Sequence, residues 1–219
     1  MICIIPARKG SKRIPGKNFR AFCGGRIIDY PIAVAQESRL FREIIVATDW
    51  DAFLAHNVTR YNRRAENATG EAELEDVLSE VLDIFPCETC CLMLPTAVFV
   101  TANMLIQAVH LLQDVEIVFP VVRFEYPPQR EMRRIAGNGS AYFVNPSAAS
   151  ANSQDLDPRY HDAGLFYMMW TVAFRDAWAW RKRLLEMENH TIEIPRTQCH
   201  DIDTEEDWEI AEMKWRAMQ

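Results

Sequence analysis

Short apolar runs alternate with segments of helical periodicity through the first half of the chain. The runs are apolar on both faces and rich in Ile and Val, as expected for strands buried in a parallel sheet. Their alternation with amphipathic helices is typical of βαβ units. The pattern predicts an α/β fold with a Rossmann-like, mostly parallel sheet flanked by helices. The predicted strands are Ile2–Pro6, Ile44–Thr48, Cys91–Leu94 and Ile117–Val121, and the helices between them are Pro31–Ser38, Asp51–Val58 and Ala102–Leu112.

Two more helices are indicated by their periodicity and by the residues at their start. The segment Glu73–Ile84 places apolar residues on one face at helical spacing. A last helix is predicted from about Thr204 to Met218. Thr204 is a favourable N-cap, and Asp207 stands where it can complete a capping box.

Residues 123–158 interrupt this regular alternation. Tyr126-Pro127-Pro128 and Gly137-Asn138-Gly139 break the segment into short strand-like stretches. Such breaks indicate a β-hairpin that leaves the sheet. We call residues 123–158 the excursion and expect it to form a lid or a dimer contact within a single domain of residues 1–219.

Composition and charge narrow the classes of partner. The chain has 219 residues, 49% of them hydrophobic, and a formal net charge of -7. An acidic protein repels polyanions, so we expect no nucleic-acid partner, and any nucleotide must be held by a local group of cations. No stretch approaches the roughly 20 apolar residues of a membrane helix, and no basic leader precedes the first apolar run. We therefore expect a cytoplasmic protein without a membrane partner.

Six cysteines raise the question of disulfides or a zinc site. Cys87-x-x-Cys90-Cys91 has part of a zinc spacing, but no second ligand pair follows it. An ordinary core of this size does not require disulfides. The pattern favours reduced thiols at a strand entrance.

Residues 7–18, which we call the cation loop, follow the first predicted strand directly. Ligands of open α/β sheets bind at the carboxyl ends of the strands. Glycines let backbone amides approach phosphate oxygens, and Lys or Arg neutralises their charge. The loop therefore predicts a triphosphate site; a solvated charge run is the alternative. Its cations are Arg8, Lys9, Lys12, Arg13 and Lys17, interspersed with Gly10, Ser11 and Gly16.

Two acidic residues near the last helix form a candidate metal site. Asp201 and Asp203 are two residues apart, so on an extended segment both carboxylates point to the same side. Mg²⁺ prefers hard oxygen ligands with positions left for water and phosphate. The alternative is a charge pair that stabilises the N-terminus of the helix beginning at Thr204.

Other polar residues have two open interpretations each. Asp49 closes the second strand at the same sheet edge, or caps the helix predicted after it. His161 and Asp162 could orient a substrate or transfer a proton, or could be structural. Gly164, next to them, would permit close approach of the backbone to a ligand.

The run Ile4–Asn18 resembles the first motif of the sugar-acid cytidylyltransferases, which activate sialic acids with CTP. The resemblance extends over nearly the whole chain, and the runs Ser153–Leu156 and Tyr160–Gly164 favour the pseudaminic acid branch of this family. The remaining matching runs stand in the order expected for the family: Ile45–Asp49, Leu94–Ala97, Tyr126–Arg130 and His200–Trp208.

The resemblance implies an enzyme that transfers CMP from CTP to a nonulosonic acid, with Mg²⁺ as cofactor and a homodimeric assembly. It implies that Asp201 and Asp203 bind Mg²⁺ and that Asn18 and Arg63 contact the cytosine. The catalytic cations it implies are Arg8, Lys12, Lys17 and Arg130, the last from the lid side. Ala7, Gly10 and Ser11 are further candidates for nucleotide binding. The candidates for sugar binding are Pro95, Thr96, Gln129, Arg130, Gln154, Tyr160, His161, Asp162 and Gly164, so Arg130 is expected to meet either phosphate or sugar.

The chain departs from the family pattern at Leu74, Leu94 and Asn152. A phosphate-binding hydroxyl is missing near Leu74 or has moved to Thr69, and Asn152 replaces a common arginine. Loss of a bidentate arginine beside an anion costs on the order of 1.5–3 kcal/mol. Alternative acceptors are therefore N-acylneuraminate, legionaminate or an eight-carbon ulosonate. An inactive nucleotide-binding homologue is the alternative outside enzymes.

Overall fold

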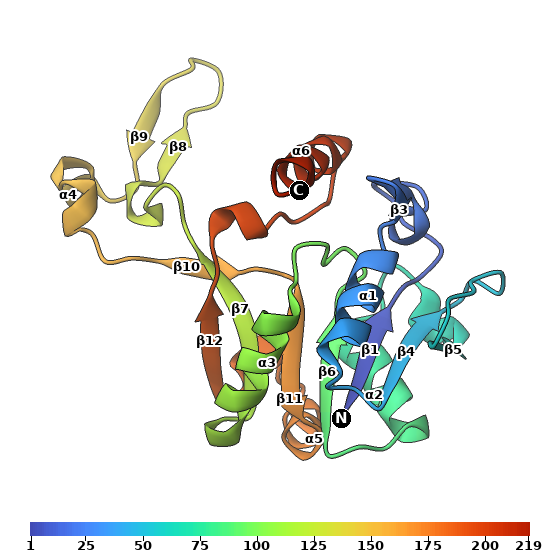
Figure 1. Ribbon diagram of the computed structural model, residues 1–219. Coiled ribbons are helices and arrows are strands. Elements are labelled where there is room, and N and C mark those ends of the chain that lie inside the picture. Colours follow the sequence, from blue (N-terminus) through green and yellow to red (C-terminus); the bar gives the residue numbers. More distant parts are fainter.

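The computed structural model describes all residues, 1–219, and is built on one mixed sheet (Figure 1). The sheet has eight strands in the order β10-β7-β11-β6-β1-β4-β5, and β12 pairs with β7 as well. The strands are β1 (Ile2–Pro6), β4 (Glu43–Thr48), β5 (Thr59–Asn62), β6 (Thr89–Met93), β7 (Ile117–Arg123), β10 (Tyr160–Asp162), β11 (Phe166–Trp170) and β12 (Asn189–Glu193).

Parallel pairing dominates the half of the sheet that carries the chain's first strands. β1 pairs in parallel with both β4 and β6, β4 with β5, and β12 with β7. β10 and β11 are antiparallel to β7, and β11 is also antiparallel to β6. The predicted mostly parallel α/β sheet is thus confirmed, with an antiparallel return strand in its middle.

Helices cover both faces of the sheet (Figure 1). On one face α1 (Asp29–Ser38) and α3 (Ala102–Leu111) pack on the larger buried cluster. On the other face α2 (Leu74–Ile84) and α5 (Thr171–Ala179) pack on a second cluster. Residues of β1 alternate between the two clusters, because successive strand side chains point to opposite faces.

A third, smaller cluster joins the two ends of the chain. It contains Ile14 of the cation loop, Phe22 of the small hairpin β2–β3 (Ala21–Phe22, Gly25–Arg26), and Ile202. Trp208 and Ala211 of α6 (Glu205–Ala217) complete its C-terminal side. Helix α6 therefore packs against the hairpin that follows the cation loop.

Most predicted elements agree with the structure to within two residues at each end. The capping box of α6 is present as predicted: Thr204 Oγ1 accepts from the Asp207 amide at 3.2 Å, and the Asp207 carboxylate accepts from the Thr204 amide at 2.8 Å. α2 has a capping box formed by Glu73 and Asp76.

The helix predicted over Asp51–Val58 is wrong. This segment forms turns, in which the Phe53 amide donates to the Trp50 carbonyl at 3.1 Å. Asn57 has a φ of 55°, a left-handed conformation that an α-helix cannot contain. Phe53 is buried, with its ring centroid 5.6 Å from that of Phe19, whereas Leu54 is 81% exposed. The apolar pattern of the segment therefore reflects one buried aromatic side chain.

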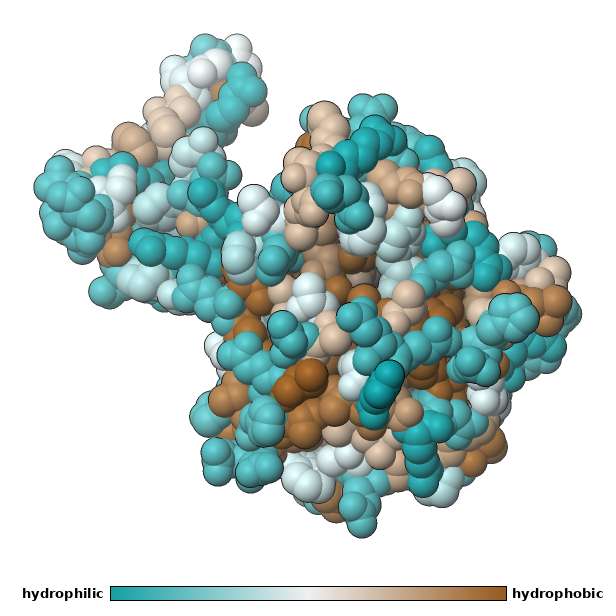
Figure 2. All heavy atoms as spheres, in the orientation of Figure 1, coloured by the Kyte–Doolittle hydropathy of each residue, from teal (hydrophilic) through white to brown (hydrophobic).

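The excursion contains the predicted hairpin and projects away from the sheet. Strands β8 (Met132–Arg134) and β9 (Ala141–Phe143) pair only with each other, and α4 (Pro146–Ser150) follows them. Every residue of the two strands is exposed. Figure 2 shows a hollow between the excursion and the body of the molecule.

Two leucines allow a matched test of the core. Leu92 of β6 is fully buried, whereas Leu54 is 81% exposed. We expect Leu92→Ala to lower the free energy of unfolding by about 2–5 kcal/mol, because it removes buried methyl groups and leaves a cavity. The same change at Leu54 should stay within about 0.5 kcal/mol. Urea denaturation of both variants measures the difference, and equal losses would contradict the described packing.

Candidate functional site

A cavity of about 620 Å³ opens at the carboxyl ends of β1 and β6. Its walls come from four segments that are distant in sequence, and we call it the cation cavity. The walls are residues of the cation loop (Arg8, Ser11, Lys12, Arg13, Lys17, Asn18), the segment before and within α2 (Arg63, Thr69, Gly70, Ala72, Glu73, Leu74, Val77), the loop after β6 (Leu94, Pro95, Thr96), and the acidic pair Asp201 and Asp203.

Two side chains fix the backbone of the cation loop by hydrogen bonds. The Lys9 amide donates to Asp49 Oδ1 at 2.6 Å, and Asn18 Nδ2 donates to the Arg8 carbonyl at 2.9 Å. Asn18 is buried and also lines the cavity. Of the two interpretations of Asp49, the helix cap is wrong, because the segment between β4 and β5 forms turns and contains no helix. Its carboxylate instead holds the loop at the sheet edge.

The segment that leads into α2 lies against the cation loop. Arg8 Nη1 donates to the Thr69 carbonyl at 2.9 Å. A Cβ atom at Gly70 would lie 3.0 Å from Arg8 Nη1 and 3.2 Å from Lys12 Cε. A larger residue at position 70 would therefore push the ends of both cationic side chains aside by a few tenths of an ångström.

Arg63 reaches the cavity from the end of β5. Burial is the main cause that lowers the pKa of its guanidinium, partly offset by the nearby Asp49 and Glu80 carboxylates. One of its terminal nitrogens donates to the Asn67 carbonyl, whereas its Nε is buried without a partner. An unpaired buried donor is costly, so Arg63 retains capacity to bind a ligand.

Glu80 of α2 organises the backbone around Arg63. This side chain is almost fully buried, and its Oε1 accepts from Tyr61 OH at 2.8 Å and from the Arg64 amide at 2.7 Å. Its Oε2 accepts from Asn67 Nδ2. A buried carboxylate with three donors thus fixes the residues on both sides of Arg63.

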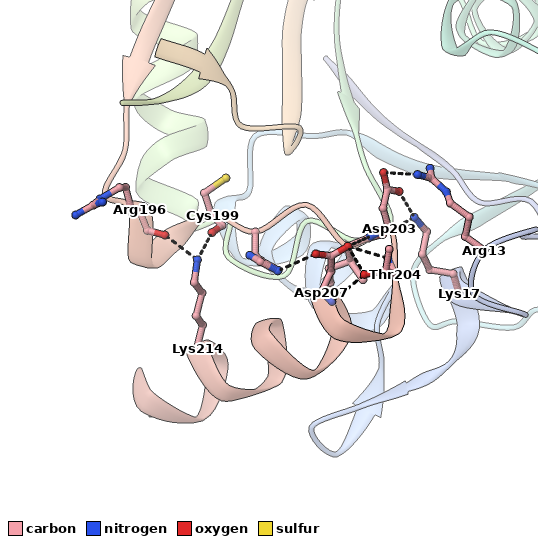
Figure 3. Close-up of polar contacts among 10 residues, drawn as sticks. Arg13, Lys17, Arg196, Cys199, Asp203, Thr204, Asp207 and Lys214 are labelled. Carbon is pink, nitrogen blue, oxygen red and sulfur yellow. Dashed lines mark hydrogen bonds and ion pairs between the residues drawn. The ribbon is translucent and has the colours of Figure 1, made fainter. Parts of the chain in front are cut away.

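Asp201 and Asp203 both line the cavity, and Ile202 between them is fully buried. This alternation matches the extended segment expected from their spacing. Asp203 pairs with Arg13 at 2.7 Å and with Lys17 Nζ at 3.4 Å (Figure 3). The pKa of Asp201 is raised, first by partial burial and then by the Asp203 carboxylate.

The donor set fits Mg²⁺ in the way that phosphate-transfer sites hold it. No group of three or more His, Cys, Asp or Glu residues could hold a metal on its own. Mg²⁺ is usually bound by one or two carboxylates together with substrate phosphates and water. Asp201 and Asp203 supply two carboxylates beside the cations of the cavity.

Of the residues expected to bind sugar, Pro95 and Thr96 line the cation cavity. The others lie outside it, in the excursion, in β10 or just after β10. Gln129 Nε2 donates to the Asp157 carbonyl at 2.7 Å. Arg130 donates to Ser153 Oγ at 2.9 Å and to two backbone carbonyls, and Gln154 is exposed. Within this chain, the side chains of Gln129 and Arg130 therefore bind other residues of the excursion.

Tyr160, His161 and Asp162 form β10, and Gly164 lies in the turn that follows it. Tyr160 is exposed, and His161 lines a small cavity together with Asp201 and packs against Phe124. Asp162 accepts from the Gly164 amide at 3.0 Å and from the Tyr167 hydroxyl. Gly164 has a φ of 61°, so glycine is needed here for the turn between the strands.

A second cavity, of about 810 Å³, lies at the base of the excursion. It shares no lining residue with the cation cavity. Its lining includes Arg130, so this residue, expected to meet phosphate or sugar, is separated from Arg8 and Lys17 within the chain. The other arginines of this second cavity are Arg123, Arg159 and Arg196.

The remaining residues of the cation loop differ in whether they line the cation cavity. Ala7 is fully buried and Gly10 does not line the cavity. Arg13, a cation of the predicted triphosphate site to which the resemblance assigned no role, does line it. All six cysteines are free, and Cys90 and Cys91 lie in different core clusters, as expected for neighbours on a strand.

None of the helices has the length and apolar character needed to cross a membrane.

Comparison with known proteins places these features in a family. A family model described as "Cytidylyltransferase" matches residues 2–117. The chain is 31% identical to a pseudaminic acid cytidylyltransferase of Campylobacter jejuni strain 81-176, over 98% of this chain and 96% of the relative. It is 26% identical to an N-acylneuraminate cytidylyltransferase of Escherichia coli O18:K1:H7, over 96% of this chain and 51% of the relative.

Solved structures share the fold at low sequence identity. A CMP:2-keto-3-deoxy-manno-octonic acid synthetase complexed with CTP has a TM-score of 0.75 at 16% identity, covering 100% of this chain and 99% of that chain. The 2-C-methyl-D-erythritol 4-phosphate cytidylyltransferase of Thermus thermophilus has a TM-score of 0.64 at 14% identity, covering 97% and 98%. These likenesses support the fold.

The contacts of Glu80 lead to a stability prediction. We expect Glu80→Gln to lower the free energy of unfolding by about 1–3 kcal/mol, because the amide cannot accept from all three buried donors. Glu209→Gln, the same change at an exposed position of α6, is the control and should be nearly neutral. Urea denaturation of both variants checks this, and a neutral Glu80→Gln would show that the three contacts do not stabilise the segment.

Proposed function

The chain belongs to the cytidylyltransferase family, and we propose that it transfers CMP from CTP to the anomeric hydroxyl of a nonulosonic acid. The observation that carries this proposal is the cation cavity. Arg8, Lys12 and Lys17 there face a pair of carboxylates at the carboxyl edge of the sheet. Such a site provides charges for a triphosphate and ligands for its metal in one place.

The reaction is an in-line displacement at phosphorus. The anomeric hydroxyl of the sugar gives its proton to solvent water, and its oxygen forms a bond to the α-phosphorus of CTP. The bond from that phosphorus to the bridging oxygen breaks, and pyrophosphate leaves with the electron pair. Arg8, Lys12 and Lys17 hold the triphosphate and neutralise the charge that develops on the leaving group.

Asp201 and Asp203 would hold Mg²⁺. When bound, the metal supplies Lewis-acid polarisation and neutralises phosphate charge. Arg13 and Lys17 pair with Asp203 and keep its carboxylate at the cavity wall. Asn18 and Arg63 are the proposed cytosine contacts, supported by their place in the cavity wall and by the unpaired Nε of Arg63.

The proposed acceptor is pseudaminic acid. This choice is supported by the 31% identity to a relative named for that sugar and by the runs Ser153–Leu156 and Tyr160–Gly164. A relative named for N-acylneuraminate matches at 26% identity, so N-acetylneuraminate is the first competing acceptor to compare.

The proposed assembly is a homodimer formed through the excursion. An isolated two-stranded hairpin is marginally stable in water, yet β8 and β9 pair only with each other. Tyr142 of β9 is 51% exposed, and Val144, two residues on and therefore on the same face of the hairpin, is 44% exposed. A second copy of the chain would cover this apolar surface.

The six free cysteines support a reducing, cytoplasmic location.

The function is tested by measuring pyrophosphate release. We expect release with CTP, Mg²⁺ and pseudaminic acid, and slower release with N-acetylneuraminate, legionaminate or an eight-carbon ulosonate. Asp203→Asn should lower kcat by roughly 100-fold or more, because several kcal/mol of charge stabilisation are lost. Asp176→Asn, at an exposed position of α5, is the matched control. CTP binding without pyrophosphate release from any sugar would favour an inactive homologue.

The assembly is tested by sedimentation velocity. We expect the protein to sediment as a dimer and Tyr142→Asp to shift it toward the monomer, since a charge would be buried in the contact. The exposed Trp180 follows α5, which lies at the opposite end of the sheet from the excursion (Figure 1), so Trp180→Asp should leave the dimer intact. A wild-type monomer at micromolar concentration would contradict the proposed assembly.

A further inference from the structure

We propose that Lys214, on α6, is a positioning residue that fixes Asp201 and Asp203 for the binding of Mg²⁺ with CTP. The inference rests on the proposed function and assigns a role to a residue outside the cation cavity. We call residues 196–204, which carry both aspartates, the aspartate segment. Apart from one short 3-10 turn, Arg196–Gln198, it has no regular secondary structure.

Lys214 binds the first part of this segment. Its ammonium donates to the Cys199 carbonyl at 2.8 Å and to the Arg196 carbonyl at 3.2 Å (Figure 3). Lys214 forms no ion pair with a carboxylate, so its charge is used on backbone acceptors. Hydrogen bonds from a charged donor are roughly twice as strong as neutral ones. The tether ends two residues before Asp201.

Asp207 binds the other end. Its Oδ2 accepts from the Asp203 amide at 3.1 Å, the Thr204 amide at 2.8 Å and Thr204 Oγ1 at 2.8 Å (Figure 3). Asp207 and Lys214 are seven residues apart on α6, about two helical turns, and so share one face. A single helix face therefore holds the segment on both sides of the aspartates.

The middle of the segment is fixed by burial and by the cation loop. Ile202 is fully buried in the cluster that includes Ala211, which lies on α6 between the two tethering positions. The Ile202 carbonyl accepts from Lys17 Nζ at 2.6 Å. With both ends and the middle held, the side chains left facing the cavity are those of Asp201 and Asp203.

Removal of the Lys214 ammonium would release one end and leave the other contacts in place. Groups that orient metal ligands affect metal affinity, and their loss typically costs about 10–100-fold. Lys214→Met retains the length and apolar stem of the side chain but lacks the donor. A purely structural tie would change stability without changing the contribution of Mg²⁺ to CTP binding.

The experiment measures the CTP affinity of the full-length protein by calorimetry without sugar, once with Mg²⁺ and once with EDTA. The ratio of the two dissociation constants gives the coupling between metal and nucleotide. We expect Lys214→Met to reduce this ratio by roughly 10–100-fold. Its affinity for CTP in EDTA should stay within about twofold of wild type, because the cation loop is unchanged.

Lys214→Arg keeps a charged donor and should retain most of the coupling. Lys182→Met, the same change at an exposed lysine outside the site, should retain all of it. If Lys214→Met does not fold, Lys214→Gln, which keeps a neutral donor, should show a smaller loss in the same direction. A wild-type ratio in folded Lys214→Met or Lys214→Gln, even with a lower unfolding temperature, would overturn the positioning role alone. Absence of CTP binding by the wild-type protein would overturn the proposed function as well.

Discussion

The burial of Ile14 and Ile202 in one small cluster is the constraint on which the site depends. Both side chains are fully buried, although each lies among charged residues in the sequence. Arg13 precedes Ile14, and Asp201 and Asp203 flank Ile202. Burial of the apolar residue in each segment keeps its charged neighbours near the cavity and so brings a cationic and an anionic segment together.

This arrangement explains how an acidic protein can hold a polyanion. The formal net charge is -7, yet four cations of the site come from one loop at the edge of the sheet, and Arg63 adds a fifth. Asp203 is the partner of Arg13 and Lys17. An incoming triphosphate must compete with this carboxylate for both cations. A divalent ion that occupies the carboxylates would free the cations for phosphate, which couples metal and nucleotide binding electrostatically.

The sequence was sufficient for the parts of the fold and site that follow from local patterns. β1, the capping box of α6 and the common direction of Asp201 and Asp203 all depend on spacing within a few residues. The prediction of a helix over Asp51–Val58 was wrong, because a single buried aromatic side chain, Phe53, lies in a segment whose apolar residues are spaced as in an amphipathic helix. β5 and the strands after Pro158 were not identified, since each is short and is defined by its partner across the sheet. The separation of Arg130 from the cation loop depends on where the excursion leaves the sheet, which no local pattern encodes.

Residues outside the cation cavity help to fix its wall, because the wall segments around Arg63 and the two aspartates share one physical problem. Arg63 and the two aspartates lie on irregular segments, whose backbone groups lack the partners that a helix or strand would provide. Neighbouring helices supply those partners from buried or half-buried charged side chains: Glu80 of α2 accepts from the segment around Arg63, and Lys214 of α6 donates to the one before Asp201. The two charges are opposite because the groups they satisfy are opposite, an amide hydrogen in one case and carbonyl oxygens in the other. Irregular loops can therefore present ligand-binding side chains in fixed positions, because the rigidity comes from the adjacent helices.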